Sequence, residues 1–583
     1  MRKGGKMKGL WVCLFCVCCA VSCAVSARAQ VVELEPIRVL AAGWDEDEAE
    51  TEAASGFGSP ESLAGRSSGV DIQSRMGFGF LQDVSIRGAV FEDADVSLNG
   101  ISLNNPQTGH FNLSLPGVSS DVTDVDVDLN GQALDFQLAE PLREGWCVRT
   151  SAGSRGTVKN LVSVTQKAGL GVHRFSLEGL RTDGLRDETD GHRTAGSYLF
   201  RRRGPEDDVT VYAAVSEKRF GENGAYAAPW YMREEEFLKQ EFVTASWKRY
   251  GDLEVTLKPY LHRTQDLFWL DRDNPSFYRN DHTTWVSGNV LDVLDPDNGR
   301  FVTLEVQRQD LRSTNLGDHN RFVYTVDLGV RPQDSGSLRS QSFGVKTTHF
   351  DNFPLKIMPF FDFRHPLSDA WGVEVEGKRI FRQPSFTELY YNSPSNIGNA
   401  DLNLQRSDNL ELGLNYRKDR VSFRADVFYR RQKDTIDWVC NTGDAAYRAV
   451  NAGRVNVRGF DLTAGLDWEM PVFDRLELSY TRLDVNRTKV YDISKYVFDY
   501  LRDRAAAALS GRRGKLEYAL KGTCEYHIDQ RDRWLLGAEA SYHLNDSARI
   551  FATGENLLDE DYDEFLNVQG DPFFVELGLE LRF

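Results

Sequence analysis

The side chains that could perform catalysis are thinly spread along this sequence. His110, His192, His282 and His349 lie in unrelated local contexts, without a nucleophile elbow or two histidines at the spacing of metal ligands. Because enzymatic chemistry needs several such groups in one place, the sequence predicts a protein that is not an enzyme.

One segment carries the oxygen ligands that calcium prefers. It runs from 183 to 190, and its candidate ligands are Asp183, Asp187 and Asp190. The spacing is not that of an EF-hand loop, and a solvated hairpin loop explains the same residues. A structural calcium ion is the one cofactor that the sequence suggests.

Cysteine chemistry is confined to the first part of the chain. Of 8 cysteines, those left beyond residue 30 are Cys147, Cys440 and Cys524, which are far apart. They offer neither a disulfide framework nor a zinc spacing. The remaining five are Cys13, Cys16, Cys18, Cys19 and Cys23.

The charge balance limits the possible partners. Aspartate and glutamate number 87 against 69 lysines and arginines, a net charge of -18. Binding to phosphate backbones needs a basic footprint, so nucleic acid is not an expected partner.

The N-terminus has the three parts of a secretory signal peptide. Basic residues lie between 2 and 8, an almost wholly apolar run covers 10–25, and Ala27-Arg28-Ala29 precedes Gln30. We expect cleavage after residue 29. A lipoprotein signal acylated at Cys23 is the alternative, although Ala20 is not the large aliphatic residue normally found there.

The elements that must position any site are strands. Beyond residue 30 no apolar stretch is long enough for a membrane helix, whereas 208–215, 421–428 and 535–542 alternate apolar and polar residues with period two. Lipid-facing and lumen-facing residues alternate in a membrane barrel, so the mean hydropathy of -0.44 does not exclude one. The best helical candidate, 500–509, is short.

The last eleven residues give the clearest strand pattern. Between Phe573 and Phe583 every second residue is apolar, which is typical of a terminal strand of an outer-membrane barrel; a half-buried strand of a soluble sandwich is the alternative. At about 20 residues per strand and connection, 146–583 accommodates about 22 strands.

The texture of the sequence divides it into four parts. After the signal peptide (1–29), 30–50 combines a short apolar patch with the acidic run 45–48, which is typical of a hydrated connector. A small mixed domain is predicted for 51–145 and the barrel for 146–583.

Several segments, in the right order, resemble the TonB-dependent outer-membrane receptors. Leu81–Gly88 resembles the strand and Arg-Gly motif of their plug domain, and 95–104 its Asn-Gly hairpin. In the barrel, the pair 381–390 and 398–402 is the most specific match, continued by 428–438, 451–461 and 556–562. The motif residues are Arg87, Gly88, Asn99, Gly100, Phe381, Arg382, Pro384, Asn399, Leu402, Asn556, Leu557, Tyr562 and Phe583.

The resemblance implies an all-β transmembrane barrel of about 22 antiparallel strands with an N-terminal α+β plug in its lumen. It places the protein in the outer membrane, in contact with lipid, as a receptor for a small-molecule nutrient. It also implies that Arg87 pairs with acidic groups of the lumen, although an ordinary solvated turn arginine is equally compatible with the sequence.

A candidate TonB box follows the cleavage site, and its partner would be the TonB–ExbB–ExbD energy-coupling complex. An exposed extended segment can add as a strand to a partner's sheet edge; Pro36 lacks an amide hydrogen and belongs at the end or the unpaired side of that strand. An unstructured tail is the alternative. The box comprises Glu35, Pro36, Ile37, Arg38, Val39, Leu40 and Ala41.

The sequence also departs from the family. The strand that normally ends the plug is replaced by 130–138, so the plug looks shortened and its seal is in question. The usual Pro-Glu after Asp401-Leu402 is replaced by Leu404-Gln405.

Cobalamin or a related corrinoid is the expected cargo, because 106–113 resembles a loop of the cobalamin-receptor branch and 271–278 supports it. Haem is disfavoured, since 381–384 and 399–402 enclose Tyr390 and Tyr391 but no histidine. The alternatives are a siderophore receptor, or a degenerate receptor acting as a passive porin or surface-binding protein. A secreted soluble β-protein is disfavoured.

Overall fold

A computed structural model provides the structure of the chain. It describes residues 64–65, 67–140, 144–222, 232–331, 340–468, 471–488, 491–495, 500–528, 532–565 and 568–583. The signal peptide and the candidate TonB box therefore lie outside the described residues.

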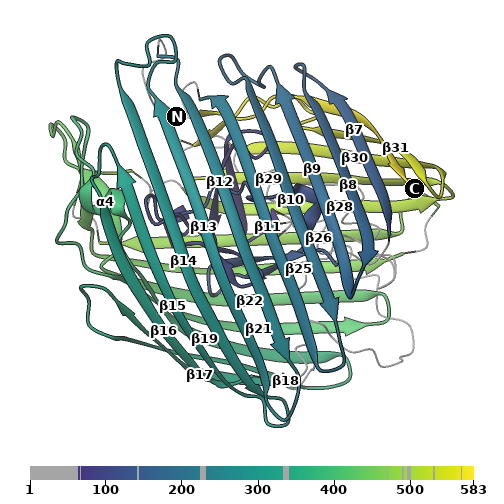
Figure 1. Ribbon diagram of the computed structural model, residues 1–583, viewed down its shortest axis with the longest axis horizontal. Coiled ribbons are helices and arrows are strands. Elements are labelled where there is room, and N and C mark those ends of the chain that lie inside the picture. Colours follow the sequence, from purple (N-terminus) through teal and green to yellow (C-terminus); the bar gives the residue numbers. More distant parts are fainter. Residues whose placement is uncertain are drawn as a thin grey trace, which may run out of the picture.

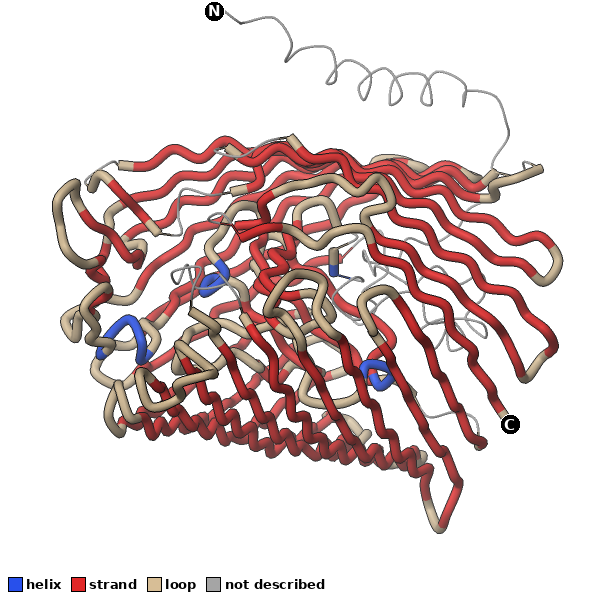
Figure 2. The backbone as a smooth tube through the Cα atoms, turned by 90° about the horizontal axis from the view of Figure 1, so that it is seen from above, coloured by secondary structure: helices blue, strands red, loops and turns tan. Residues whose placement is uncertain are grey.

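Twenty-two antiparallel strands close into a barrel, which confirms the predicted fold class (Figures 1 and 2). The barrel begins at Gly145, and its last strand, β34, pairs with its first, β7. The strands are β7 (Gly145–Gly153), β8 (Val158–Ala168), β9 (Gly171–Thr182), β10 (Gly191–Arg203), β11 (Asp207–Gly221), β12 (Glu235–Arg249), β13 (Glu254–Trp269), β14 (Arg279–Asp295), β15 (Arg300–Ser313), β16 (His319–Val330), β17 (Ser340–Phe350), β18 (Lys356–Pro366), β19 (Trp371–Arg382), β21 (Gln405–Lys418), β22 (Val421–Lys433), β25 (Arg454–Asp467), β26 (Arg475–Arg487), β28 (Leu501–Arg513), β29 (Leu516–His527), β30 (Arg533–Asn545), β31 (Ala548–Glu555) and β34 (Phe574–Arg582).

The period-two sequence pattern sorts side chains between lipid and lumen. In β22, Val427 and Tyr429 are 58% and 45% exposed on the outer surface, whereas Asp426, Phe428 and Arg430 between and beside them are buried inside. Because alternate residues of a strand point to opposite faces, one strand supplies both an apolar outer wall and a polar inner wall.

The two ends of the barrel differ in their connections. At one end, which we call the turn end, neighbouring strands are joined by tight turns such as 419–420 and 514–515. The opposite end, the loop end, carries long connections, among them 383–404 and 434–453. Gly145 and Phe583 both lie at the turn end, where the backbones of Trp146 and Phe583 exchange two hydrogen bonds.

The plug occupies the interior of the barrel (Figure 2). Between 67 and 140 the described plug consists of short strands and two 3-10 turns. One sheet pairs β1 with β2, and a second has the order β4-β3-β6-β5. The plug elements are β1 (Val70–Met76), β2 (Leu81–Ile86), η1 (Phe91–Asp93), β3 (Asp95–Leu98), β4 (Ile101–Ser102), η2 (Ser119–Asp121), β5 (Val122–Asp128) and β6 (Ala133–Leu138).

The atypical stretch at the end of the plug is a full part of its sheet. Residues Ala133–Leu138 form β6, which pairs parallel with β3 and antiparallel with β5. Asn99 and Gly100, both with positive φ (50° and 76°), make the two-residue turn between β3 and β4, as expected of an Asn-Gly hairpin. The plug sheet is thus complete despite its altered sequence.

The plug core continues into one wall of the barrel. Val96, Leu98 and Phe136 of the plug share a buried apolar cluster with Tyr212 and Phe242 of β11 and β12. Apolar burial is non-directional, so this contact holds the plug against the wall formed by β10 to β14.

The loop-end connections carry small elements of their own. The one described α-helix there, α4 (Phe386–Tyr390), begins with a capping box between Ser385 and Glu388, which satisfies its first amides. The short strands are β20 (Asn396–Ile397), β23 (Ile436–Cys440), β24 (Tyr447–Asn451), β27 (Ile493–Ser494), β32 (Asp563–Phe565) and β33 (Val568–Gln569).

The helical candidate at 500–509 was wrong: Leu501–Arg513 forms β28. Its alanine run suits a helix by propensity, but pairing with β26 and β29 in the closed sheet decides the local structure. Within the described part of the chain, no helix has the length and apolarity needed to cross a membrane.

Candidate functional site: the plug–barrel contact and the outer pocket

Arg87 stands at the end of β2 in a backbone conformation that turns the chain sharply. Arg87 and Gly88 have φ of 49° and 67°, a left-handed conformation that suits glycine. A Cβ at Gly88 would lie 3.1 Å from the Leu483 side chain. The Arg-Gly pair therefore lets the plug backbone approach the barrel wall and directs the arginine into it.

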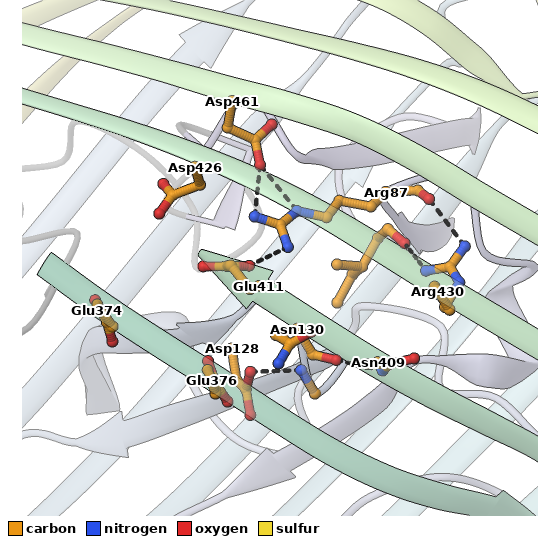
Figure 3. Close-up of polar contacts among 12 residues, drawn as sticks. Arg87, Asp128, Asn130, Glu374, Glu376, Asn409, Glu411, Asp426, Arg430 and Asp461 are labelled. Carbon is orange, nitrogen blue, oxygen red and sulfur yellow. Dashed lines mark hydrogen bonds and ion pairs between the residues drawn. The ribbon is translucent and has the colours of Figure 1, made fainter. Parts of the chain in front are cut away.

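The Arg87 guanidinium is buried between two barrel carboxylates (Figure 3). Its Nη2 and Nε lie 2.6 Å and 2.8 Å from Asp461 of β25, and its Nη1 pairs with Glu411 of β21. The ring of Phe428 lies 3.9 Å from the guanidinium carbon, at cation–π distance. The structure thus contains the lumen pairing, and Arg87 is not a solvated turn residue.

Burial disfavours the charge on Arg87, but Asp461 and Glu411 outweigh burial and raise the pKa of the guanidinium above its ordinary value. The group therefore stays charged. A buried ion pair of this kind contributes little net stability. Removing one partner, however, leaves the other charges buried without compensation, which costs about 3–5 kcal/mol.

The two carboxylates belong to a wider charged wall on β19 to β25. Arg424 lies 2.8 Å from Glu374, 2.7 Å from Asp426 and 3.3 Å from Glu411. On the plug side, Asp128 lies 2.6 Å from the ammonium group of Lys378. Several charges of both signs therefore hold the plug to this wall.

Arginine side chains of the barrel also donate hydrogen bonds to carbonyl groups of the plug backbone. Arg430 donates to the carbonyls of Arg87 (2.9 Å) and Ile86 (3.3 Å) (Figure 3). Arg193 donates to the carbonyls of Leu115 and Gly117 at 3.0 Å and 2.6 Å. These bonds satisfy buried backbone oxygens that the plug sheets leave open.

The barrel motif at 381–390 meets the plug loop at 106–113. The amides of Phe386 and Thr387 donate to the carbonyls of Pro106 (2.9 Å) and Gln107 (2.8 Å). Arg382 lies 2.9 Å from Glu388 in α4 and 3.0 Å from Asp93 in the plug. Two motifs far apart in sequence therefore form one contact.

The departure at Leu404-Gln405 takes part in the same contact. The Gln405 amide donates to Asp93 at 2.6 Å, and its oxygen accepts from the Ile436 amide at 2.9 Å. Gln432 donates to the same carboxylate at 2.7 Å. Gln405 thus links the barrel, the plug and the loop strand β23.

A pocket, which we call the outer pocket, opens between the plug and the loop-end elements. Its volume is about 180 Å³, and it is walled by the plug, by β12 and β13, by α4 and by Trp438 of β23. Plug residues in its lining include Arg75, Asp83, Glu92 and His110. Asp83 lies 3.1 Å from Arg75 and 3.3 Å from the Nε2 atom of His110.

Burial shifts the pKa values of two plug side chains that line the outer pocket. Burial is the main cause that lowers the pKa of His110, outweighing the attraction of Asp83, so the imidazole is neutral at pH 7. Burial and then the carboxylate of Glu388 raise the pKa of Glu92 well above its ordinary value, although Arg382 opposes them. Such shifts are common where a site binds ligands.

The other motif residues have structural places. Leu402 packs in a loop cluster with Trp438, and the amide of Asn399 donates to the carbonyl of Glu388 at 2.9 Å. Asn556 donates to the carbonyls of Glu560 and Asp571, which folds the 556–573 connection. The remainder stabilise strands or turns: Phe381 in β19, Pro384 as acceptor from Arg321, Leu557 beside Gly554, Tyr562 under Arg533, and Phe583 at barrel closure.

Acidic residues of the segment 183–190 form ion pairs with arginines. Asp190 lies 2.7 Å from Arg272, and neighbouring Glu188 pairs with Arg272 and Arg233. Among the described residues, no group of three or more His, Cys, Asp or Glu is arranged to hold a metal ion. Calcium binding by Asp183, Asp187 and Asp190 remains a prediction.

Sequence inspection missed the barrel partners Glu411, Asp461, Lys378 and Arg430. The sequence feature that could have identified them is a charged residue at every second position of a strand whose other face is apolar. Arg424, Asp426 and Arg430 of β22 show this pattern. A lipid-facing residue cannot be charged cheaply, so such residues must face the lumen. Which plug residue each one meets depends on the barrel register.

Comparison with known proteins agrees with this architecture. The family described as "TonB dependent receptor-like, beta-barrel" matches residues 94–557. No curated protein sequence matches the chain.

Solved structures share the fold at low sequence identity. The siderophore receptor PirA from Pseudomonas aeruginosa aligns with a TM-score of 0.69 and 14% identity, covering 92% of this chain and 98% of its own. The FrpB iron transporter from Neisseria meningitidis gives 0.74 and 13%, covering 96% and 100%. The copper transporter OprC gives 0.72 and 13%, covering 88% and 94%.

The barrel with its apolar outer surface locates the protein in the outer membrane, as predicted. The family match spans most of the chain, and the plug lies inside the barrel, tied to its wall through Arg87. The chain belongs to the family of TonB-dependent receptors, which are transport receptors of the outer membrane.

Proposed function

We propose that this receptor binds a scarce nutrient at its loop end and releases it past the plug when the TonB–ExbB–ExbD complex pulls on the box at 35–41. The observation that supports this most directly is the buried pairing of Arg87 with Glu411 and Asp461. It ties the plug to the barrel through contacts that external work can break.

The energetics fit a mechanically gated plug. The outer membrane has no supply of nucleotides, so work must come from a partner. Apolar contact with β10 to β14 loses free energy in proportion to the area exposed. The hydrogen bonds of an ion pair such as Arg87–Asp461 need donor–acceptor distances of about 3 Å and therefore break over a short displacement. We propose that a pull breaks the charged wall first and leaves the plug held by its apolar side.

We assign the cargo to the class of metal-containing nutrients, a corrinoid or a metal–siderophore chelate. The corrinoid assignment rests on the resemblance of 106–113, which lies beside the outer pocket through Thr108, His110 and Phe111. The chelate assignment rests on the fold shared with receptors and transporters whose names cite siderophores, iron and copper.

The test uses labelled cobalamin and labelled ferric siderophores in cells that express the receptor. Substituting Ile37→Pro in the box removes a backbone donor from the strand that TonB would pair with, so we expect uptake to fall to background while surface binding persists. Ile37→Val keeps the donor and serves as the matched control.

Which label is taken up in a box-dependent way identifies the cargo. Uptake that is unchanged by Ile37→Pro would instead show a passive porin, and binding without any uptake would show a surface-binding protein. Either result contradicts the proposed energy coupling.

A further inference from the structure

Four carboxylates crowd together at the loop end of β11 to β13. Glu222 follows β11, Glu234 precedes β12, Glu236 lies in β12 and Asp266 in β13. The amide of Glu222 donates to the carbonyl of Glu234 at 3.0 Å, which holds the two segments side by side. Glu236 and Asp266 form part of the wall of the outer pocket.

Glu222 is fully buried, and within the described part of the chain both oxygens of its carboxyl group lack a hydrogen-bond donor when ionised. It faces the carboxyl group of Glu236, and two carboxyl groups can share only a proton or a bound cation. Burial, then Glu236, Glu234 and Asp266, raise the pKa of Glu222 well above its ordinary value. Without a cation the cluster must therefore take up protons.

Asp266 is also incompletely satisfied. Its carboxylate interacts with Gln107, but no described residue supplies a donor to the buried Oδ1 atom. The ammonium group of Lys218, which attracts Asp266, donates to the carbonyls of Gly79 and Phe80 in the plug. An unsatisfied buried acceptor costs free energy, so a donor supplied by a ligand would be favourable here.

Negative charge is in excess on one wall of the pocket. The lining carboxylates Asp83 and Glu388 are paired with Arg75 and Arg382, whereas Asp266 is attracted by Lys218 but repelled by Glu236 and Asp281. An anionic ligand would be repelled from this wall, and a cationic one attracted.

The lining favours an organic cation over a bare metal ion. No three His, Cys, Asp or Glu side chains of the described residues have an arrangement for a metal ion. The aromatic side chains of Phe91, Phe111 and Trp438 line the same pocket. Carboxylates with aromatic faces are the groups that recognise ammonium ligands.

We propose that the outer pocket receives an organic cation, the protonated amine group of the imported nutrient, which donates to Asp266 with the Glu222–Glu236 pair behind it. A volume of about 180 Å³ is smaller than the roughly 300–1,000 Å³ of a site for a whole drug-sized ligand. The pocket therefore holds one charged group of the cargo. This inference rests on the proposed function and adds the charge class of the ligand.

The test is calorimetric titration of the purified, detergent-solubilised full-length receptor with spermidine at constant ionic strength, repeated with calcium chloride. We expect spermidine to bind, and its affinity to fall about tenfold or more in Asp266→Asn, because a charge-assisted hydrogen bond is lost. Glu222→Gln is expected to weaken binding in the same direction. Asp318→Asn removes an exposed carboxylate at the same end of the barrel and should leave the affinity unchanged.

Heat-modifiable migration on a gel verifies that each variant is folded before titration. Failure of spermidine to bind the wild-type receptor, or equal affinity in Asp266→Asn, would overturn the proposal. Calcium binding that depends on Asp266, without spermidine binding, would show a metal site and would also overturn it.

The titration does not involve the box at 35–41, so its outcome is separate from that of the uptake assay. A receptor that fails to bind spermidine but shows uptake sensitive to Ile37→Pro would retain the proposed function and lose this inference. The reverse pair of results would retain the inference alone.

Discussion

The Arg87 side chain connects the plug and the barrel, the two bodies that the proposed transport step would separate, and its environment suits that task. A buried charge surrounded by carboxylates is specific in position, because only one geometry satisfies all its donors. It is also close to neutral in net stability, because desolvation offsets most of the attraction. The contact therefore fixes the resting plug without making its release prohibitive.

Replacing this arginine tests the contact. In Arg87→Gln the carboxylates of Glu411 and Asp461 lose their shared counter-charge, so we expect the plug to be destabilised by about 3–5 kcal/mol. Urea unfolding followed by hydrogen exchange of β1 and β2 measures the loss.

The exposed pair of Arg458 with Asp484 supplies the control. Arg458→Gln should cost about 0–1 kcal/mol, as surface pairs do. Equal effects of the two substitutions would show that burial of Arg87 does not matter. The double variant Arg87→Gln, Glu411→Gln should recover part of the lost stability, because the uncompensated carboxylate of Glu411 is also removed.

At the scale of elements, α4 transmits contact between the loops and the plug. Its five residues are too few for a stable isolated helix, so the capping box of Ser385 and Glu388 and the two bonds to the plug loop must hold it. A ligand that displaces the 106–107 loop would therefore break the hydrogen bonds that this loop makes with α4.

Removing the cap should loosen this element. Ser385→Ala deletes the hydroxyl that accepts from the Glu388 amide at 3.1 Å, and we expect a loss of about 0.5–2 kcal/mol. Hydrogen exchange of 386–390 measures it as faster exchange. Ser395→Ala, in the exposed part of the same connection, should leave exchange of α4 unchanged; an unchanged α4 in Ser385→Ala as well would show that the cap does not hold the helix.

The 556–573 connection contains a pH-sensitive contact with the plug. Ser74 donates to Asp571 at 3.2 Å. Burial, assisted by Glu564 and Glu555 and opposed by Arg186, raises the pKa of Asp571 from 3.8 to about 7. An acid whose pKa is raised on folding stabilises the fold in its protonated form; that stability is fully present below pH 3.8 and is lost progressively as the pH rises to about 7.

Asp571→Asn should remove this dependence. The asparagine cannot ionise, so the variant and the wild type should melt at similar temperatures at about pH 4, and the variant should melt increasingly higher up to about pH 7 and above. Intrinsic tryptophan fluorescence against temperature measures both. Asp561→Asn, an exposed carboxylate in the same connection, should follow the wild type at every pH; a difference between Asp571→Asn and wild type that is independent of pH would contradict the titration.

At the scale of the whole molecule, the plug is attached asymmetrically. Its apolar core merges with β10 to β14, where Arg193 and Lys218 bond to plug carbonyls, whereas the ion pairs of Arg87 and Asp128 lie on β19 to β25. In Figure 1, β10 to β14 cross the front of the barrel and β21 to β25 its back. Water entering the charged side replaces lost ion pairs at little cost, while water on the apolar side does not. A channel opened by force should therefore form along the charged wall.

Deleting the plug should convert the receptor into a pore. A barrel of 22 strands encloses an aqueous lumen when it is empty, so removal of 51–140 should give passive, unselective permeability to small sugars in liposome swelling. Deletion of 35–41 alone leaves the plug in place and should give no swelling. A tight barrel without its plug would contradict the role of the plug as the seal.

Sequence reasoning reached the outline of the fold because lipid imposes strict periodicity. Val427 and Tyr429 had to face outward and Asp426 and Arg430 inward, whatever their neighbours, since a charge in the bilayer is too costly. Local geometry was equally readable at Asn99-Gly100, where two residues determine the turn. At 501–513, in contrast, propensity favoured a helix and the closed sheet produced β28, because every strand needs two hydrogen-bonded neighbours in lipid.

The sequence alone determined the alternation and the membrane barrel, since both follow from the residue types themselves, whereas attention to Arg87 came from the resemblance to the receptor family. Only the tertiary structure decided that Arg87 meets Glu411 and Asp461, and that Asp266 and Glu222 share one buried cluster. Those contacts join residues tens to hundreds of positions apart. They depend on the register of 22 strands and on the seating of the plug within them, which no local pattern encodes.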